Sequence, residues 1–306
     1  MEKNVLVIEG KRIGRMRASF LLFTETFKFL WSDKEMLWIP ILSGLTQLFL
    51  VGILTVTVLI PFGFLGEGGN TQGVQHTQRI EYLYIFVFYV ISAFTIAYSQ
   101  AIVTHIVYTR VRGGDATLWS GIATAGRHWI TLFAWACITS TVGIILRVIA
   151  ERSSILVKII VLILGSAWSV LTYFVVPAII IDNKSALSAI GHSGTVFKRT
   201  WGETLVTNIS FGLVFVLAVL ALSVVMVGAV IATGGGVAIL FVCIPIILLA
   251  ILICVVLSAV LDSVLRVLLY VYASEQIIPT NFNKELLESI LSRKSVTSEI
   301  QTQTTV

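Results

Sequence analysis

The chain has 306 residues, of which 57% are hydrophobic and only 12% are charged. Soluble globular domains have about a quarter of their residues charged, so this composition excludes a water-soluble fold, which could not cover so much apolar surface. The net charge of +5 does not indicate a nucleic-acid-binding protein, because the basic residues are spread through segments that flank apolar runs. We therefore expect an integral membrane protein without a nucleic-acid partner.

The N-terminal segment is charged and lacks a short apolar region followed by a small-residue cleavage site. It reads MEKNVLVIEGKRIGRMR. We therefore expect no removable signal peptide, so that the first membrane helix itself directs insertion. We interpret residues 1–35 as a cytoplasmic, amphipathic N-terminal arm.

Six apolar stretches are long enough to cross a bilayer, whose hydrocarbon core of about 30 Å needs roughly 20 helical residues. They are Met36–Leu65, Ile80–Tyr108, Trp129–Ile149, Ile155–Ile181, Leu205–Ala232 and Val237–Leu261, the last continuing as a helix to about Tyr272. The sequence thus predicts an all-α fold, an integral membrane bundle of about six transmembrane helices within residues 36–272. Residues 273–306 are expected to form a cytoplasmic tail that is disordered at its Ser/Thr-rich end.

The basic residues divide the connections into two sets that alternate along the chain. Gly66–Arg79, Ala150–Ser154 and Thr233–Gly236, with their flanks, hold four of the 21 Lys and Arg residues, and the other connections and the termini hold seventeen. Basic residues are retained on the cytoplasmic side during insertion. The split predicts a multi-pass protein of the cell (plasma) membrane with both termini in the cytoplasm.

An amphipathic segment ending in tryptophan precedes each odd-numbered span on the cytoplasmic side. In the third segment the apolar stripe is Ala186, Ile190, Phe197 and Trp201, and the opposite face is Ser188, His192, Thr195 and Arg199. The equivalent stripes are Leu118, Ile122, Ala125 and Trp129 in the second segment, and Phe20, Phe27 and Trp31 in the first, where Thr24 interrupts the stripe. These stripes predict interfacial helices on the cytoplasmic side, anchored by Trp31, Trp129 and Trp201.

The same segments allow two interpretations of the whole chain. They fit a threefold repeat of an interfacial helix followed by a transmembrane hairpin, but linkers between spans are often amphipathic without any repeat. Asp115, after two glycines, and Asp182-Asn183, after the fourth span, are each expected to cap the helix that follows.

Asp262 and Arg266 are the charged pair of the apolar helices, four residues apart on the continuation of the sixth span. This spacing places both on one helix face, where they can form an ion pair. One interpretation is a gate or an anion-binding site at the cytoplasmic mouth of the bundle. The alternative, which we favour, is a structural ion pair at the membrane boundary.

The other polar residues of the apolar segments do not form a recognisable site. His105, His128 and His192 lie near the cytoplasmic surface with Asp115, Asp182 and Asp262, but their spacing matches no metal-ligand motif. Gln47, Ser99, Gln100, Thr104 and Asn208 can line a pathway or join helices by hydrogen bonds. Pro61, Pro177 and Pro245 can kink or end their helices. We expect no metal site.

The sequence contains no catalytic motif. There is no His-Glu-x-x-His pair, Walker loop or dinucleotide-binding glycine pattern, and Cys137, Cys243 and Cys254 have no metal or redox spacing and are expected to be core residues. We therefore predict no catalytic residue and no cofactor.

The stretch Thr172–Thr207 resembles a family of uncharacterised prokaryotic polytopic membrane proteins that is known only as a domain of unknown function. The resemblance rests on Pro177, Asp182 and Phe197-Lys198-Arg199-Thr200-Trp201-Gly202, with further similarity in LLYVYAS and KFLWSDKEMLWIPILSG. The pattern is also distantly similar to the membrane domain that accompanies some glycerophosphodiester phosphodiesterases. This similarity implies fold and lipid-related work but gives no catalytic residue.

The function that we predict is that of a non-enzymatic membrane scaffold or accessory subunit. Its expected partners are membrane lipids and a partner protein or a second copy of the chain. The alternative is a transporter or permease for a small or lipid-like substrate. A water-accessible cavity that reaches Gln47, Gln100 or Asn208 would favour transport, whereas a sealed bundle would favour a scaffold.

Overall fold

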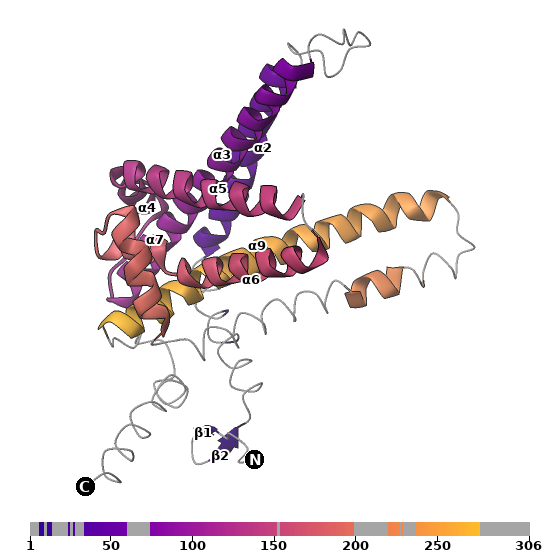
Figure 1. The fold of residues 1–306 in the computed structure, drawn as a ribbon. Coiled ribbons are helices and arrows are strands. Elements are labelled where there is room, and N and C mark those ends of the chain that lie inside the picture. The colour runs from indigo at the N-terminus through magenta and orange to yellow at the C-terminus, as the bar shows by residue number, and fades with distance from the viewer. Residues whose placement is uncertain are drawn as a thin grey trace. The chain divides into compact units, whose positions relative to one another are not determined.

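The computed structural model describes residues 6–8, 11–13, 24, 27, 34–59, 74–151, 154–198, 220–226, 228 and 237–275 (Figure 1). These residues divide into two compact units. The first contains the described parts of Met1–Leu37, Thr109–Gly114 and Lys198–Val306, and the second contains those of Trp38–Tyr108 and Asp115–Phe197. The second unit holds the helices α2 to α7, and the first holds α9.

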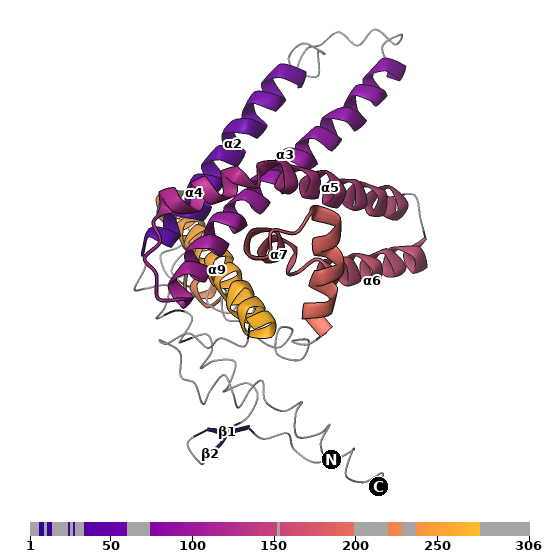
Figure 2. The same cartoon turned by 90° about the vertical axis from the view of Figure 1, so that its left-hand side faces the viewer.

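Two long helices, α2 (Trp38–Leu59) and α3 (Val74–Val111), form a pair in the second unit (Figures 1 and 2). Two hydrogen bonds between side chains join them. Gln47 Nε2 donates to Ser92 Oγ, and the hydroxyl oxygens of Thr55 and Tyr84 lie 3.1 Å apart. Uncharged polar groups are commonly used in this way between membrane helices.

The short helix α4 (Leu118–Arg127) follows α3 after a turn at Gly113, whose φ of 80° is the left-handed conformation common after a helix. Thr117 caps α4, since its side chain accepts from Ser120 N–H and the Ser120 side chain accepts from Thr117 N–H. The prediction that Asp115 caps this helix is therefore wrong. A hydroxyl next to the first turn completes a capping box, and the carboxylate lies two residues too early.

The helices α5 (Trp129–Glu151) and α6 (Ile155–Leu171) form an antiparallel hairpin (Figure 2). On the inner side of the hairpin, the rings of Trp135 and Trp168 stack with their centroids 6.3 Å apart. The α5 helix buries Leu132, Trp135, Ala136 and Ser140, whereas no residue of α6 is buried.

The predicted span Ile155–Ile181 is broken near its end. After α6 the chain turns at Thr172 and re-enters a short helix, α7 (Val175–Ile181). Pro177 lies in the first turn of α7, where a missing N–H costs nothing, whereas in a continuous helix it would clash with the carbonyl of Tyr173. The proline therefore accounts for the break.

A second short helix covers residues 186–198. Asn183 precedes it with a φ of 52°, a left-handed conformation that asparagine tolerates, and Lys184 N–H donates to Ala178 O. Asp182 is the C-terminal cap residue of α7. The Asp182-Asn183 pair thus ends α7, and the next helix begins at residue 186. That the pair also caps this helix stays a prediction.

The first unit is built around α9 (Val237–Glu275). Pro245 lies inside this helix without ending it. The 3-10 helix η1 (Lys34–Leu37) packs against α9 with a fully buried Met36, and Arg112 forms an ion pair of 2.8 Å with Glu275 near its end. A two-stranded antiparallel sheet of β1 (Leu6–Ile8) and β2 (Lys11–Ile13) lies in the N-terminal arm and was not predicted.

Five helical stretches of the described residues are long and apolar enough to cross a membrane. They are Glu35–Thr57, Leu83–Val111, Trp129–Glu151, Ile155–Ile181 and Cys243–Glu275. They match five of the six predicted spans, and most of the remaining one, the fifth in chain order, Leu205–Ala232, lies outside the described residues, as does Pro61. The helices are those of a multi-pass membrane protein.

Candidate functional site

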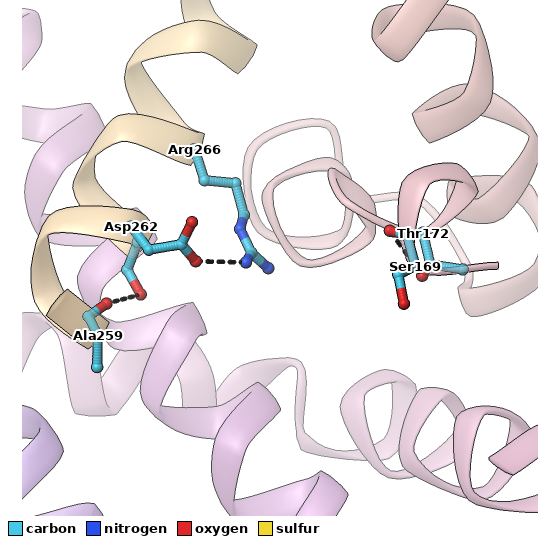
Figure 3. Close-up of polar contacts among 6 residues, drawn as sticks. Ser169, Thr172, Ala259, Asp262 and Arg266 are labelled. Atoms are coloured by element: carbon cyan, nitrogen blue, oxygen red, sulfur yellow. Dashed lines mark hydrogen bonds and ion pairs between the residues drawn. The ribbon is translucent and has the colours of Figure 1, made fainter. Parts of the chain in front are cut away.

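The predicted pair on α9 forms an ion pair in the structure (Figure 3). Arg266 Nη2 donates to Asp262 Oδ2 at 2.6 Å, with 17% of the arginine side chain and 36% of the aspartate side chain exposed. The four-residue spacing on one helix brings the two groups together without any other element. Arg266 is the more deeply buried partner. Its positive charge therefore needs the carboxylate for compensation more than the carboxylate needs the guanidinium.

The ion pair lies in the half of α9 that is buried. Most side chains from Val260 to Val271 are buried, including Tyr270, which is fully covered, whereas many of those from Phe241 to Val255 are exposed. Asp262 and Arg266 therefore belong to a packed part of the helix. A charged pair among well-packed residues has the surroundings of a structural ion pair.

Two histidines of the second unit contact the turn after α7. His128, at the end of α4, places Nε2 2.8 Å from Asn183 Oδ1 and Nδ1 3.0 Å from Thr124 O. His192, in the helix of residues 186–198, places Nε2 3.2 Å from Asp182 Oδ2. These two contacts join α4 and the helix of residues 186–198 to the turn after α7. This is why polar residues gather at that turn.

The predicted metal-ligand candidates do not converge. Within the residues that the structure describes, no three His, Cys, Asp or Glu side chains come close enough to hold a metal ion. His105 lies within α3, away in sequence from the turn that His128 and His192 contact. Asp115 lies in the connection between α3 and α4.

The helix of residues 186–198 is packed on protein through a face that the sequence only partly indicated. Its buried residues are Ala186, Ala189, Ser193, Val196 and Phe197. Ser193 Oγ accepts a hydrogen bond of 2.9 Å from Phe174 N–H, which lies at the break before α7. The buried face therefore differs from the predicted stripe, which ran through Ile190. The sequence could not show this, because an amphipathic pattern shows an apolar face but not what covers it.

The helix α4 packs on protein through a face that includes only Ala125 of its predicted stripe, since Leu118 and Ile122 are half-buried and Trp129 is exposed. Gly121 and Ala125 are buried, and a Cβ at Gly121 would lie 2.8 Å from Ile102 Cγ2 of α3. The exposed apolar side chains of the two short helices are instead Trp119 and Leu187. Of the predicted anchors, Trp129 is exposed at the start of α5, and Trp31 and Trp201 lie outside the described residues.

Several polar side chains of the spans hydrogen-bond to their own helix. Ser99 and Thr104 donate to carbonyls four residues earlier in α3, those of Thr95 and Gln100. Asn208 lies outside the described residues. Gln47 donates to Ser92, and this hydrogen bond joins two of the described helices.

A groove with a volume of about 540 Å³ lies between α5 and α6. Its lining consists of Thr139, Gly143, Leu146, Arg147 and Ala150 from α5 and Val161, Leu162, Gly165, Ser166, Trp168 and Ser169 from α6. None of the polar residues singled out from the sequence lines it. On each of the two helices the lining residues share one face, as their spacing in the sequence requires. The groove itself forms only where the face of α5 meets the face of α6.

A family of unknown function, DUF6159, matches residues 79–278. This match covers more than half of the chain, so the protein belongs to this family. No curated protein and no solved structure matches it. The five candidate spans are those of a multi-pass membrane protein, and the family does not define its function.

Proposed function

We propose that the protein is a non-enzymatic membrane scaffold or accessory subunit. The observation that carries the proposal is the use of several polar groups in the described spans. Gln47 Nε2 joins α2 to α3 by donating to Ser92, and hydroxyl groups such as that of Ser166 donate to carbonyls of their own helix. A transport pathway needs polar side chains that face a shared cavity.

The large apolar surface of the spans supports the same role. Side chains of α2, such as Leu48 and Phe49, and many along α6 and the first half of α9 are exposed. Lipid, another subunit or a second copy of the chain can cover such faces equally well, since association between membrane helices depends on packing. We propose membrane lipids and a partner protein or second copy as the binding partners.

The orientation belongs to this proposal. The charge split along the sequence places both termini in the cytoplasm and the protein in the cell membrane. With this orientation, α4 and the helix of residues 186–198 lie on the cytoplasmic side, where the exposed Trp119 and Leu187 can enter the lipid boundary. The histidine contacts to Asp182 and Asn183 then stiffen the cytoplasmic face against which a partner docks.

A permease for a lipid-like substrate is the second candidate, and the groove between α5 and α6 is the observation that favours it. The distant similarity to the membrane domain of some glycerophosphodiester phosphodiesterases points the same way. The groove contains hydroxyl groups, but those of Ser166 and Ser169 bond to carbonyls of α6. We therefore place transport second.

One preparation separates the two candidates. The full chain is purified from its own membrane in mild detergent, and the proteins and lipids that accompany it are quantified by mass spectrometry. The same material in vesicles is tested for translocation of a fluorescent phospholipid. A scaffold retains a partner protein or a second copy in a fixed ratio and translocates no more lipid than empty vesicles. Translocation above that background, with no partner retained, would overturn the scaffold.

A further inference from the structure

Two glycines, Gly143 of α5 and Gly165 of α6, line the groove between these helices. A Cβ added at Gly143 would be in van der Waals contact with Tyr89 Cε1 at 3.9 Å, and one added at Gly165 in contact with Leu146 Cδ1 at 3.8 Å. The groove has a volume of about 540 Å³, which lies in the range of roughly 300–1,000 Å³ typical of small-ligand pockets.

The wall of this groove is apolar in effect, although it includes hydroxyl groups. Ser166 Oγ donates to Leu162 O at 2.8 Å, and Ser169 Oγ donates to Gly165 O at 3.0 Å. A hydroxyl that donates to its own helix offers no donor to an occupant. Trp168 adds a flat apolar surface that is held in place by stacking on Trp135. The groove therefore suits a hydrocarbon chain better than water or a polar solute.

Positive charge lies at the end of the groove near the turn of the hairpin. Arg147 lines the groove, one turn before the end of α5. Lys158 is exposed one turn after the start of α6, and it precedes Leu162 by four residues and Gly165 by seven, so it lies on the same helix face. Long basic side chains one turn inside a membrane helix extend toward the headgroups.

Arg147 retains donors for an anion although it already has a carboxylate partner. Its Nε donates to Glu151 Oε1 at 2.6 Å, and its Nη1 lies 3.5 Å from the hydroxyl oxygen of Tyr89. A guanidinium has five N–H donors, so the edge formed by its two amino nitrogens is largely open to a phosphate. Glu151 orients the group and at the same time weakens its attraction for an anion.

We propose that the groove between α5 and α6 binds one acyl chain of an anionic phospholipid, with Arg147 and Lys158 holding its phosphate. The acyl chain of such a lipid matches the apolar groove, and its anionic phosphate matches the basic end of the groove at Arg147 and Lys158. A second transmembrane helix would fill the apolar part but would leave the positive end without a partner. The lipid site does not depend on the scaffold role, because the hairpin of the second unit forms it alone.

Trp168 makes the site measurable, because bromine on a lipid tail quenches tryptophan fluorescence only at contact. The full-length protein is placed in phosphatidylcholine vesicles that contain a small fraction of phosphatidylglycerol, and the bromine is carried by one lipid or the other. We expect brominated phosphatidylglycerol to quench several-fold more per molecule than brominated phosphatidylcholine. The excess should disappear in Trp168→Phe, whose remaining tryptophans report the general lipid contact.

Three further variants test the two parts of the site. Lys158→Gln, at an exposed position, should reduce the headgroup preference, and Glu151→Gln should increase it by freeing Arg147. Gly165→Leu should abolish quenching of Trp168 by either lipid, because its side chain fills the groove. Equal quenching by the two lipids, or an excess that survives Trp168→Phe, would overturn the proposal. Disulfide-linked dimers of Gly165→Cys would also overturn it, since they would place a second copy of the chain in the groove.

Discussion

The helices α6 and α7 are consecutive parts of one apolar segment, and they differ completely in burial. No residue of α6 is buried, whereas Val175, Val176, Pro177, Ala178, Ile179 and Ile180 of the seven-residue α7 are all buried. The joint span is strongly apolar apart from Lys158, with a mean hydropathy of 2.3. Hydropathy measures the preference for any apolar medium, so it cannot tell a lipid-facing helix from a protein-facing one.

What distinguishes α7 is a partner helix of small residues. Ala189 and Ser193 of the helix 186–198 are fully buried, and Ser193 satisfies the backbone donor of Phe174. The Phe174 and Phe197 rings lie 6.2 Å apart. In α6 the small residues Gly165 and Ser169 face the groove instead. Small residues thus permit close approach in one case and leave a space in the other.

The largest difference in stability between variants of the α7 region and variants of α6 should appear when a buried aromatic side chain is truncated. Phe174→Ala removes a fully buried ring, so it should lower the free energy of unfolding by about 3–5 kcal/mol, measured by titration with sodium dodecyl sulfate in mixed micelles. Leu162→Ala, at a side chain that is 70% exposed, should change it by less than about 0.5 kcal/mol. Similar losses at both positions would mean that α6 is as closely packed as α7.

The ion pair of α9 extends the comparison to a buried charge. Asp262→Ala leaves the Arg266 guanidinium in a packed part of the helix and should cost about 2 kcal/mol, less than for a fully buried pair because the aspartate is partly exposed. The double change with Arg266→Ala should cost less than Asp262→Ala alone. Unfolding in the same micelles measures both variants. If the single and double variants lose equal stability, the two groups do not act as a pair.

A smaller effect is expected from the hydroxyl that joins α7 to its partner. Ser193→Ala leaves the buried Phe174 N–H without an acceptor and should cost about 1–2 kcal/mol. Ser166→Ala in α6 is the matched control, because its hydroxyl bonds only to Leu162 O and its loss should cost less than about 0.6 kcal/mol. A Ser193→Ala variant as stable as the control would show that the N–H finds another acceptor, such as water.

The sequence predicted those features that depend on one helix at a time. Five of the six spans, the Asp262–Arg266 spacing and the helical character of 118–127 and 186–198 follow from periodicity and length, and the structure has them. The predicted cap of α4, Asp115, was wrong because the hydroxyl of Thr117, two residues later, caps the helix instead. The groove and the buried face of 186–198 could not be predicted, since both depend on how separate helices meet. The proposed threefold repeat stays a prediction.

The smallest expected effect is a difference in environment along the exposed face of the helix 186–198. Ser188, Gly191 and Thr195 are exposed polar or small residues, whereas Leu187 is apolar and 72% exposed. A helix that lies along the cytoplasmic boundary of the membrane should place Leu187 toward the acyl chains and Thr195 toward water. Spin labels at these four positions, none of which is buried, leave the packing on α7 intact. Positions 187 and 191 are one turn apart on the same face. We therefore expect collisions with oxygen to be most frequent at 187, lower at 191, and about two-fold lower at 188 and 195 than at 187, because oxygen concentrates in hydrocarbon, and collisions with a water-soluble nickel chelate to show the reverse order. Equal access of the chelate to all four labels would place the helix in water, and its apolar face would then serve only to hold α7.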